Sequence, residues 1–267
     1  MQVIGLCRFS YPALGGFQVE HATLEERIAY LYAPARMDER FRHFQAITLP
    51  ALKTQTDPDF TFGIVVGDTL PAPYMERLLD LLADFPQAVV LPTAPGEHRP
   101  VMQSALNSLR TDINAPCLQF RHDDDDAVSV DYVQILRETA ADCAGLIARN
   151  KYVAIDFNRG FVARPDAQGI AAMPTMTPYW GVALAMSVQG GVRQTIMNFA
   201  HNKMVNFMPT VTRTDADMFV RGHNDYNDSR QRKNIKPEPL EPLDAQGEAH
   251  FAARFAIDCA SVRRIFA

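Results

Sequence analysis

The sequence predicts a single α/β domain with a mostly parallel central sheet flanked by helices. Short, mostly apolar runs alternate with longer helical patterns through the first two thirds of the chain, which is the order expected of strands joined by helical crossovers. The 267 residues, of which 47% are hydrophobic, provide enough apolar material for one large core. Length alone would equally allow two small domains.

Four apolar runs are the expected strands of this sheet: Val3 to Phe9, Phe60 to Val66, Ala88 to Leu91 and Cys117 to Phe120. Their apolar character is that of strands buried on both faces of a parallel sheet. Asp38 to Leu49 and Tyr74 to Phe85 carry apolar residues near helical spacing and are long enough to connect parallel strands. Repeated strand, helix and strand is typical of a doubly wound fold.

A helix is predicted after four consecutive aspartates, Asp123 to Asp126. Ser129 can cap this helix, whose apolar face holds Val133, Leu136, Ala140, Cys143 and Ile147. The aspartates are therefore expected in a loop between a strand and a helix. This is the carboxyl end of the strands, where open α/β sheets bind ligands.

From Lys151 onward the pattern is less regular. Strands are predicted at Tyr152 to Phe157 and Gly160 to Ala163, around a turn at Asn158 to Gly160, and at Thr195 to Phe199. A stiff proline-rich linker, Pro237 to Pro242, precedes a predicted helix from Ala245 to Phe266. We therefore expect residues 1–236 to form the domain, and residues 237–267 to form a linker and a C-terminal helix packed on the same domain.

Composition excludes several classes of partner and compartment. The formal net charge of −5 and the isoelectric point near 5.8 argue against a nucleic-acid partner. The beginning of the chain does not have the pattern of a signal peptide, and no apolar run is long enough to span a bilayer. The four cysteines are isolated and form no C-x-x-C pair. These features predict a cytoplasmic protein with reduced thiols and no transmembrane segment.

The four aspartates are the part of the sequence that indicates chemistry. Consecutive carboxylates at the end of an apolar strand repel one another, and a low-dielectric pocket strengthens the repulsion unless a cation neutralises them. Oxygen ligands suit magnesium, calcium or manganese, and magnesium commonly takes one or two protein carboxylates and completes its shell with substrate phosphates. The alternative is a solvated acidic loop, which the position between a strand and a helix disfavours.

The same region carries a family resemblance. The order Arg-x-Asp-x-Asp-Asp-Ala, given by Arg121, Asp123, Asp125, Asp126 and Ala127, resembles the D-x-D region of GT-A glycosyltransferases, and in particular a bacterial family described as rhamnosyltransferases. Shorter similar stretches extend the resemblance up to the proline-rich linker: Arg8-Phe9-Ser10, Arg40-Phe41, Leu49-Pro50, Gln55-Thr56-Asp57, Leu70-Pro71 and His223-Asn224. The resemblance implies a GT-A-like, Rossmann-like domain.

The resemblance also implies a reaction and a cofactor. A sugar would pass from a nucleotide-diphosphate donor to a hydroxyl of a glycan or lipid-linked acceptor, with Mn²⁺ or Mg²⁺ bound at the D-x-D motif. Asp123 and Asp125 would be the D-x-D pair, one on the ribose side and one on the metal. Asp126 would help to position the metal or the donor sugar, and His223 best matches a third metal ligand. Rhamnose is suggested by the family's name alone, so the donor sugar stays open.

The register of the D-x-D pair has an alternative. Because the run also contains Asp124, the pair could be Asp124 and Asp126. The first register is preferred because Arg121 then keeps the spacing of the family.

Charged residues elsewhere complete the expected site. Arg8, near the end of the first strand, and Asp68, after the second, are placed to meet the nucleotide, and Arg121 joins Asp123 in the donor-binding set. The departing diphosphate needs positive charge, which Arg221, Arg230, Arg232 and Lys233 could supply.

Other side chains are candidates for the remaining roles. Asp156, at the end of a predicted strand, is a candidate general base for the acceptor hydroxyl, and Asp217 is another. Trp180 could stack on a sugar, although a core position is the favoured interpretation. His201 is interpreted as structural.

Two other functions compete with glycosyl transfer. In a metal-dependent phosphoester hydrolase the aspartates would hold a metal that activates water, but the chain has no histidine-rich motif for a second metal. In a non-catalytic calcium-binding or interaction domain the run would be a structural ion site, but it does not have the spacing of an EF-hand loop. Peripheral contact of a transferase with a membrane face stays open.

Overall fold

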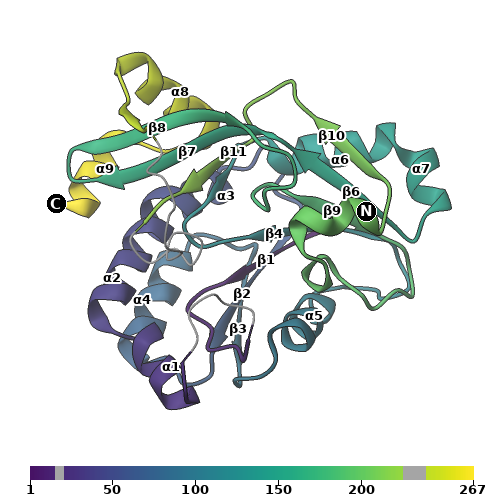
Figure 1. The fold of residues 1–267 in the computed structure, drawn as a ribbon, viewed down its shortest axis with the longest axis horizontal. Coiled ribbons are helices and arrows are strands. Elements are labelled where there is room, and N and C mark those ends of the chain that lie inside the picture. Colours follow the sequence, from purple (N-terminus) through teal and green to yellow (C-terminus); the bar gives the residue numbers. More distant parts are fainter. Residues whose placement is uncertain (16–20, 225–238) are drawn as a thin grey trace.

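A computed structural model of the chain describes residues 1–15, 21–224 and 239–267. Within these ranges a seven-stranded sheet forms the centre of the molecule, in the order β10-β6-β9-β4-β1-β2-β3 (Figure 1). Its strands are β1 (Gln2–Arg8), β2 (Thr61–Gly67), β3 (Ala88–Thr93), β4 (Cys117–His122), β6 (Tyr152–Phe157), β9 (Ala185–Val188) and β10 (Thr210–Arg213). All neighbours in this sheet are parallel except the two pairs that β9 makes with β4 and β6. The predicted α/β fold class with a mostly parallel central sheet is confirmed.

The apolar runs of the first half are strands for the reason that the sequence indicates. In β1, Val3 and Cys7 contribute to the core on one face of the sheet, whereas Ile4 and Leu6 contribute to the core on the other. Successive side chains of a strand point to opposite faces, so a strand covered on both sides must be apolar throughout.

Helices cover both faces of the central sheet (Figure 1). The face of Val3 is covered by segments that bring Phe41, Phe44 and Leu78 into the core, and the opposite face by a helix that brings Met102 and Leu106. The first set comprises α1 (Leu24–Leu31), α2 (Pro34–His43), the π-helix η1 (Phe44–Thr48), α3 (Leu49–Lys53) and α4 (Ala72–Leu82), and the second contains α5 (His98–Ser108). No described helix is both long and apolar enough to span a membrane.

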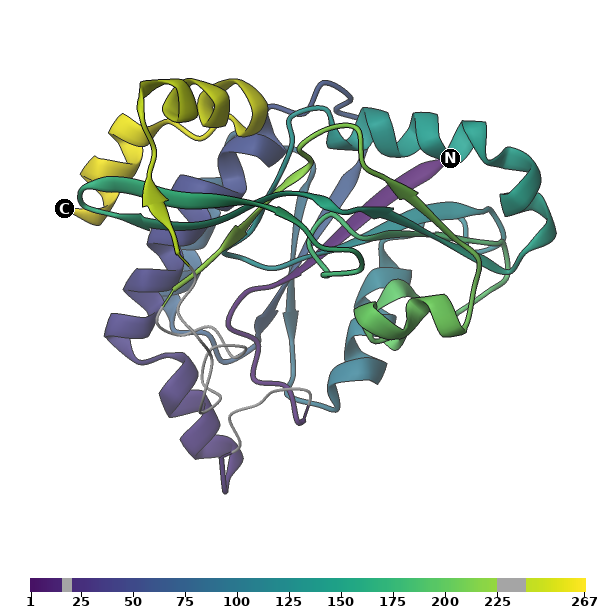
Figure 2. The ribbon, with the colours of Figure 1, turned by 45° about the horizontal axis from the view of Figure 1, so that its top comes forward.

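A second sheet lies beside the end of the central one, in the order β12-β8-β7-β11-β5. Its strands are β5 (Ala127–Val128), β7 (Arg159–Asp166), β8 (Gly169–Met176), β11 (Phe219–Gly222) and β12 (Glu241–Pro242). The helices α8 (Ala245–Phe255) and α9 (Cys259–Phe266), yellow in Figure 2, pack on it and bury Phe251, Phe255 and Val262. The remaining helices are α6 (Tyr132–Asp142), α7 (Ala144–Arg149) and the 3₁₀ segments η2 (Ile196–Asn198) and η3 (His201–Asn206).

The strand predicted at Thr195 to Phe199 is wrong, because Ile196–Asn198 form the 3₁₀ helix η2, with Thr195 and Phe199 as its caps. Asn198 accepts at its side chain from the backbone N–H of Thr195 at 2.8 Å, and the Thr195 hydroxyl donates to the same oxygen at 3.1 Å. The Thr195 side chain in turn accepts from the backbone N–H of Asn198, and this reciprocal capping satisfies the first turn locally. It outweighs the β propensity of the segment.

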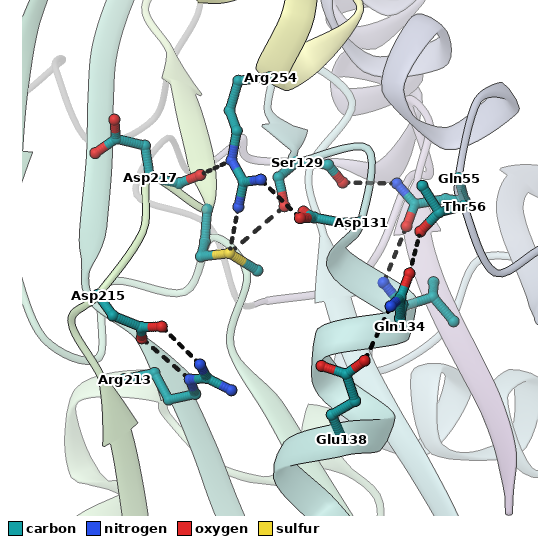
Figure 3. A network of polar contacts seen from close by, with 12 residues as sticks. Gln55, Thr56, Ser129, Asp131, Gln134, Glu138, Arg213, Asp215, Asp217 and Arg254 are labelled. Atoms are coloured by element: carbon teal, nitrogen blue, oxygen red, sulfur yellow. Dashed lines mark hydrogen bonds and ion pairs between the residues drawn. The ribbon is translucent and has the colours of Figure 1, made fainter.

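The predicted cap at Ser129 is also wrong. The N-cap of α6 is Asp131, while the Ser129 hydroxyl contacts the sulfur of Met218 at 3.5 Å. The Ser129 carbonyl accepts from the Gln55 side chain at 2.7 Å, as Figure 3 shows. Ser129 therefore joins the segment after the aspartates to neighbouring chain instead of starting the helix.

The C-terminal segment differs from its prediction in two ways. The predicted single helix from Ala245 to Phe266 is interrupted at Ala256, whose φ of 54° is left-handed. The end of the predicted linker is a strand, since Glu241 and Pro242 pair with β8; Pro237 and Glu238 lie outside the described residues. Arg254 joins α8 to the rest of the molecule, donating to the Asp217 carbonyl at 2.6 Å and to the Asp131 carboxylate at 2.7 Å (Figure 3).

The turn predicted at Asn158 to Gly160 does not make a hairpin. β6 belongs to the central sheet, whereas β7 pairs with β8 and β11 in the second sheet. The chain crosses from one sheet to the other at Asn158, a transition that the short-range pattern does not distinguish from a hairpin turn.

Candidate functional site

The aspartate run connects the two sheets, because β4 ends at His122 and β5 begins at Ala127. Its backbone is held by the Thr48 hydroxyl of η1, which donates to the carbonyl of Asp126 at 2.8 Å. The backbone N–H of Gly222, at the end of β11, donates to Oδ1 of Asp126 at 3.0 Å. A Cβ at Gly222 would lie 1.9 Å from the carbonyl oxygen of Asp125, so only glycine allows β11 to come this close.

The four carboxylates point in different directions. Asp124 is 2% exposed and forms an ion pair and hydrogen bond with Arg40 of α2. Asp123, Asp125 and Asp126 instead line one cavity of about 100 Å³. This arrangement favours Asp123 and Asp125 over Asp124 and Asp126 as the pair that faces a ligand, because Arg40 already neutralises Asp124.

Two arginines and an aromatic wall complete the cavity. Arg121 of β4 and Arg221 of β11 line it together with Trp180 and His201, which come from the segment before β9 and from η3. The Arg221 guanidinium lies over the Trp180 ring at 4.4 Å from its centroid. Carboxylates and guanidinium groups therefore face the same small space.

The fold perturbs these acids in opposite directions. Burial raises the pKa of Asp125 to about 6, and the neighbouring carboxylates of Asp124 and Asp123 add to the effect. Burial also raises the pKa of Asp126 well above its ordinary value, with Asp125 and Asp123 again contributing. For Asp123, desolvation by the cavity walls acts to raise the pKa, but Arg8 and Arg121 outweigh it and lower the pKa. Of the three carboxylates that line the cavity, Asp123 is thus the one most readily charged, and its side chain is 55% exposed.

Comparison with known proteins identifies the family. The family model described as "Putative rhamnosyl transferase" matches residues 2–236. The chain belongs to this family. The match confirms the resemblance that the aspartate motif and the shorter stretches indicated.

Solved structures of S. aureus TarS are also similar to this chain. TarS 1-349 in complex with UDP-GlcNAc gives a TM-score of 0.46 at 10% identity, over 88% of this chain and 62% of that chain. TarS 1-349 in complex with UDP gives 0.42 at 10% identity, over 84% and 61% respectively. The chain spans about three fifths of the length of these TarS structures. No curated protein sequence matches the chain.

The structure places only some of the other predicted residues at the cavity. Arg8 lies at its edge, with Nη2 4.0 Å from Oδ1 of Asp123. Asp68 is exposed after β2 and does not line the cavity. Asp217 forms an ion pair with Arg159 at 2.7 Å and a hydrogen bond with Nε2 of His250 at 3.1 Å, which gives it a structural role. Arg230, Arg232 and Lys233 lie outside the described residues.

Two predicted residues lie next to the cavity without lining it. His223 is 3% exposed and sits between Gly222 and Asn224, both of which hydrogen-bond to the aspartates. Asp156 is 1% exposed in β6, and its Oδ1 accepts from the backbone N–H of Tyr179 at 3.0 Å. Asp156 therefore supports the wall that carries Trp180 and does not face the cavity.

The cavity contains the type of ligand atom that binds a divalent metal. Asp123 and Asp125 offer hard oxygen ligands, and the raised pKa of Asp125 indicates that a nearby positive charge would stabilise its ionised form. In the described part of the chain, however, no three His, Cys, Asp or Glu side chains already converge as a metal-ligating group. The arrangement suits a metal that takes one or two protein carboxylates and receives its other ligands from a bound phosphate.

Trp180 packs against the apolar core and His201 contacts the Tyr179 carbonyl oxygen, as their favoured interpretations from the sequence expect. The sequence does not predict that these two side chains together form a wall of the cavity. Both are half-buried and line the cavity. One signal was available: Pro178 and Gly181 flank Tyr179 and Trp180 closely, which is typical of a turn rather than of a core strand.

Proposed function

We propose that this protein is a glycosyltransferase that moves a sugar from a nucleotide-diphosphate donor to a hydroxyl of a glycan or lipid-linked acceptor. The observation that carries the proposal is the cavity of this family member, where Asp123 and Asp125 meet the guanidinium groups of Arg121 and Arg221. Rhamnose is the proposed donor sugar on the family description alone.

The cavity offers what the leaving group requires. When the bond between the anomeric carbon and the diphosphate oxygen breaks, negative charge develops on the diphosphate, and fixed positive charge in a desolvated site stabilises it. Arg121 and Arg221 supply such charge, with Arg8 at the edge of the site. Asp126 helps to set the position of the donor through its fixed place beside Gly222.

We further propose that Mn²⁺ or Mg²⁺ binds between Asp123 and Asp125. When bound, the metal neutralises charge on the diphosphate. His223 stays a proposed third ligand, since it adjoins the residues that hold the aspartates but does not line the cavity.

The test is thermal unfolding with and without Mn²⁺ or Mg²⁺, against a panel of nucleoside diphosphates and nucleotide sugars. A ligand at about 100 times its dissociation constant adds about 2.7 kcal/mol to the free energy of unfolding. We expect one nucleotide to stabilise the wild type only with metal, and the shift to be lost in Asp125→Asn. Asp80→Asn is the matched control, because Asp80 is exposed on α4 away from the cavity.

Each contrary outcome has a distinct meaning. If a nucleotide stabilises the protein against thermal unfolding without metal, the donor site stands and the metal is removed from the proposal. No shift with any nucleotide would reject the transferase. Release of phosphate from simple phosphoesters would favour a hydrolase, and stabilisation by metal alone would favour a structural ion site.

A further inference from the structure

The wall of the cavity around Trp180 has an unusual backbone. Tyr179, Gly181 and Ala183 have φ values of 54°, 99° and 55°, so three residues within five are in the left-handed region. Two of the three have a Cβ, for which this region is strained. Such a conformation persists only when the surroundings hold it in place.

Two side chains hold this wall from opposite sides of the same residue. Oδ1 of Asp156 accepts from the backbone N–H of Tyr179 at 3.0 Å, and Nδ1 of His201 lies 2.6 Å from the Tyr179 carbonyl oxygen. Gly181 also lies close to the His201 imidazole, because a Cβ at Gly181 would lie 3.5 Å from Cγ of His201. The position of His201 is therefore set by the strained segment.

The contact with the Tyr179 carbonyl also decides which nitrogen of His201 carries the proton. A carbonyl oxygen can only accept, so Nδ1 must be the donor. In the neutral ring Nε2 then has the lone pair and can accept a proton. His201 lines the cavity, which makes it an imidazole whose tautomer is fixed by the fold at the proposed site of reaction.

The electrostatic surroundings keep this ring neutral. Burial lowers the pKa of His201, the Tyr179 carbonyl acts in the opposite sense, and Arg121 and Arg221 lower the pKa further, with a smaller opposing effect of Asp123. The ionisable groups that share the cavity with it are Arg121, Asp123, Asp125, Asp126 and Arg221, and Lys203 is on its own element, η3. A proton acceptor at neutral pH needs such an unprotonated ring.

We propose that His201 is the general base of the reaction, and that Asp156 is a positioning residue that acts through Tyr179. The inference rests on the proposed glycosyl transfer. The acceptor hydroxyl gives its proton to Nε2, and its oxygen forms a bond to the anomeric carbon. The bond from that carbon to the diphosphate breaks, and its electron pair leaves with the diphosphate. This single displacement inverts the configuration at the anomeric carbon.

The proposal gives Asp156 a different role from the one predicted from the sequence. A base must reach the hydroxyl that it deprotonates, either directly or through one water. The Asp156 side chain is buried in β6 behind Tyr179 and does not line the cavity, whereas His201 does.

The experiment compares donor binding with turnover in His201→Asn and His201→Ala. The asparagine amide can still donate to the Tyr179 carbonyl but cannot act as a base. We expect both variants to keep the nucleotide-dependent thermal shift and to lose about 10²–10⁴-fold in kcat for transfer. Added imidazole should restore part of the kcat of His201→Ala. His250→Ala, which removes a histidine outside the cavity, should keep the wild-type kcat.

A second pair of variants separates positioning from base catalysis at Asp156. Asn in place of Asp156 can still accept from the Tyr179 N–H, so Asp156→Asn should keep kcat within a few-fold, whereas Asp156→Ala should lower it. If Asp156 were itself the base, both variants would be inactive. The anomeric configuration of the product gives an independent readout, and retention would overturn the proposed displacement.

The possible outcomes separate a failure of His201 as the base from a failure of the proposed glycosyl transfer. If the wild type transfers sugar and His201→Asn does so at a similar rate, His201 is not the base while the glycosyltransferase stands. If the wild type neither binds nor transfers any nucleotide sugar, the proposed function fails and the inference fails with it. Loss of donor binding in His201→Asn would reassign His201 to the donor site and also overturn the inference.

Discussion

Asp156 illustrates how the fold sets the charge of one residue. Burial raises the pKa of its carboxyl to about 6, and the hydrogen bond from Tyr179 only partly opposes this shift. An aspartate in an unfolded chain has a pKa near 3.9, so the folded state holds this proton more tightly. The stabilisation by the proton is complete below about pH 3.9 and is lost as the pH rises through about 6.

We predict that Asp156→Asn raises the free energy of unfolding at pH 7, by about 1–3 kcal/mol, because two pKa units correspond to roughly 2.7 kcal/mol. The gain should vanish near pH 4, where the wild-type carboxyl is protonated. Urea unfolding of both proteins from pH 4 to pH 7 measures it. A difference between the two that does not change with pH would contradict the raised pKa.

At the scale of elements, two short departures from ideal helices position the site and the C-terminal segment. The predicted helix over Asp38 to Leu49 contains the π-helical turn η1, and Thr48 at its end donates to the carbonyl of Asp126. The C-terminal helix is divided at Ala256, after which Asp258 caps α9 by accepting from the backbone N–H groups of Ala260 and Ser261. Both departures serve long-range packing rather than local propensity.

We predict that Ala256→Gly stabilises the protein by about 0.4–1 kcal/mol, because glycine adopts the left-handed conformation of this position without the strain that a Cβ imposes. The shift of the urea midpoint measures the change. Ala252→Gly is the matched control, since Ala252 is exposed within α8 and glycine should destabilise there by about 0.5–1 kcal/mol. Destabilisation by both substitutions would argue against the break at Ala256.

At the scale of the whole molecule, the C-terminal helices are joined to the strands that carry the site. Phe251 is 0% exposed and packs in one apolar cluster with Ala127 of β5 and Val220 of β11, which flank the aspartates and Gly222. We therefore propose that residues 239–267 unfold in one cooperative unit with the described residues before them.

We predict that Phe251→Ala lowers the free energy of unfolding by about 3–5 kcal/mol, since it leaves a cavity in this cluster. The single tryptophan, Trp180, reports on the cavity wall by fluorescence, and far-ultraviolet circular dichroism reports on all helices. Both signals should change at one urea midpoint, in the wild type and in the variant. Loss of dichroism before the change in fluorescence would show that the C-terminal helices unfold separately.

The sequence by itself determined the fold class, the strands β1 to β4, β6 and β7, and the position of the four aspartates after β4. Strands covered on both faces must be apolar along their length, and a run of four carboxylates is visible without any neighbour. Only the tertiary structure decided which aspartates face the cavity. Arg40, Gly222 and Asn224 are distant in the chain, and their hydrogen bonds with Asp124, Asp126 and Asp125 set the direction of each carboxylate. The same holds for His201, whose tautomer depends on a carbonyl in a strained segment 22 residues away, and no periodic pattern encodes that contact.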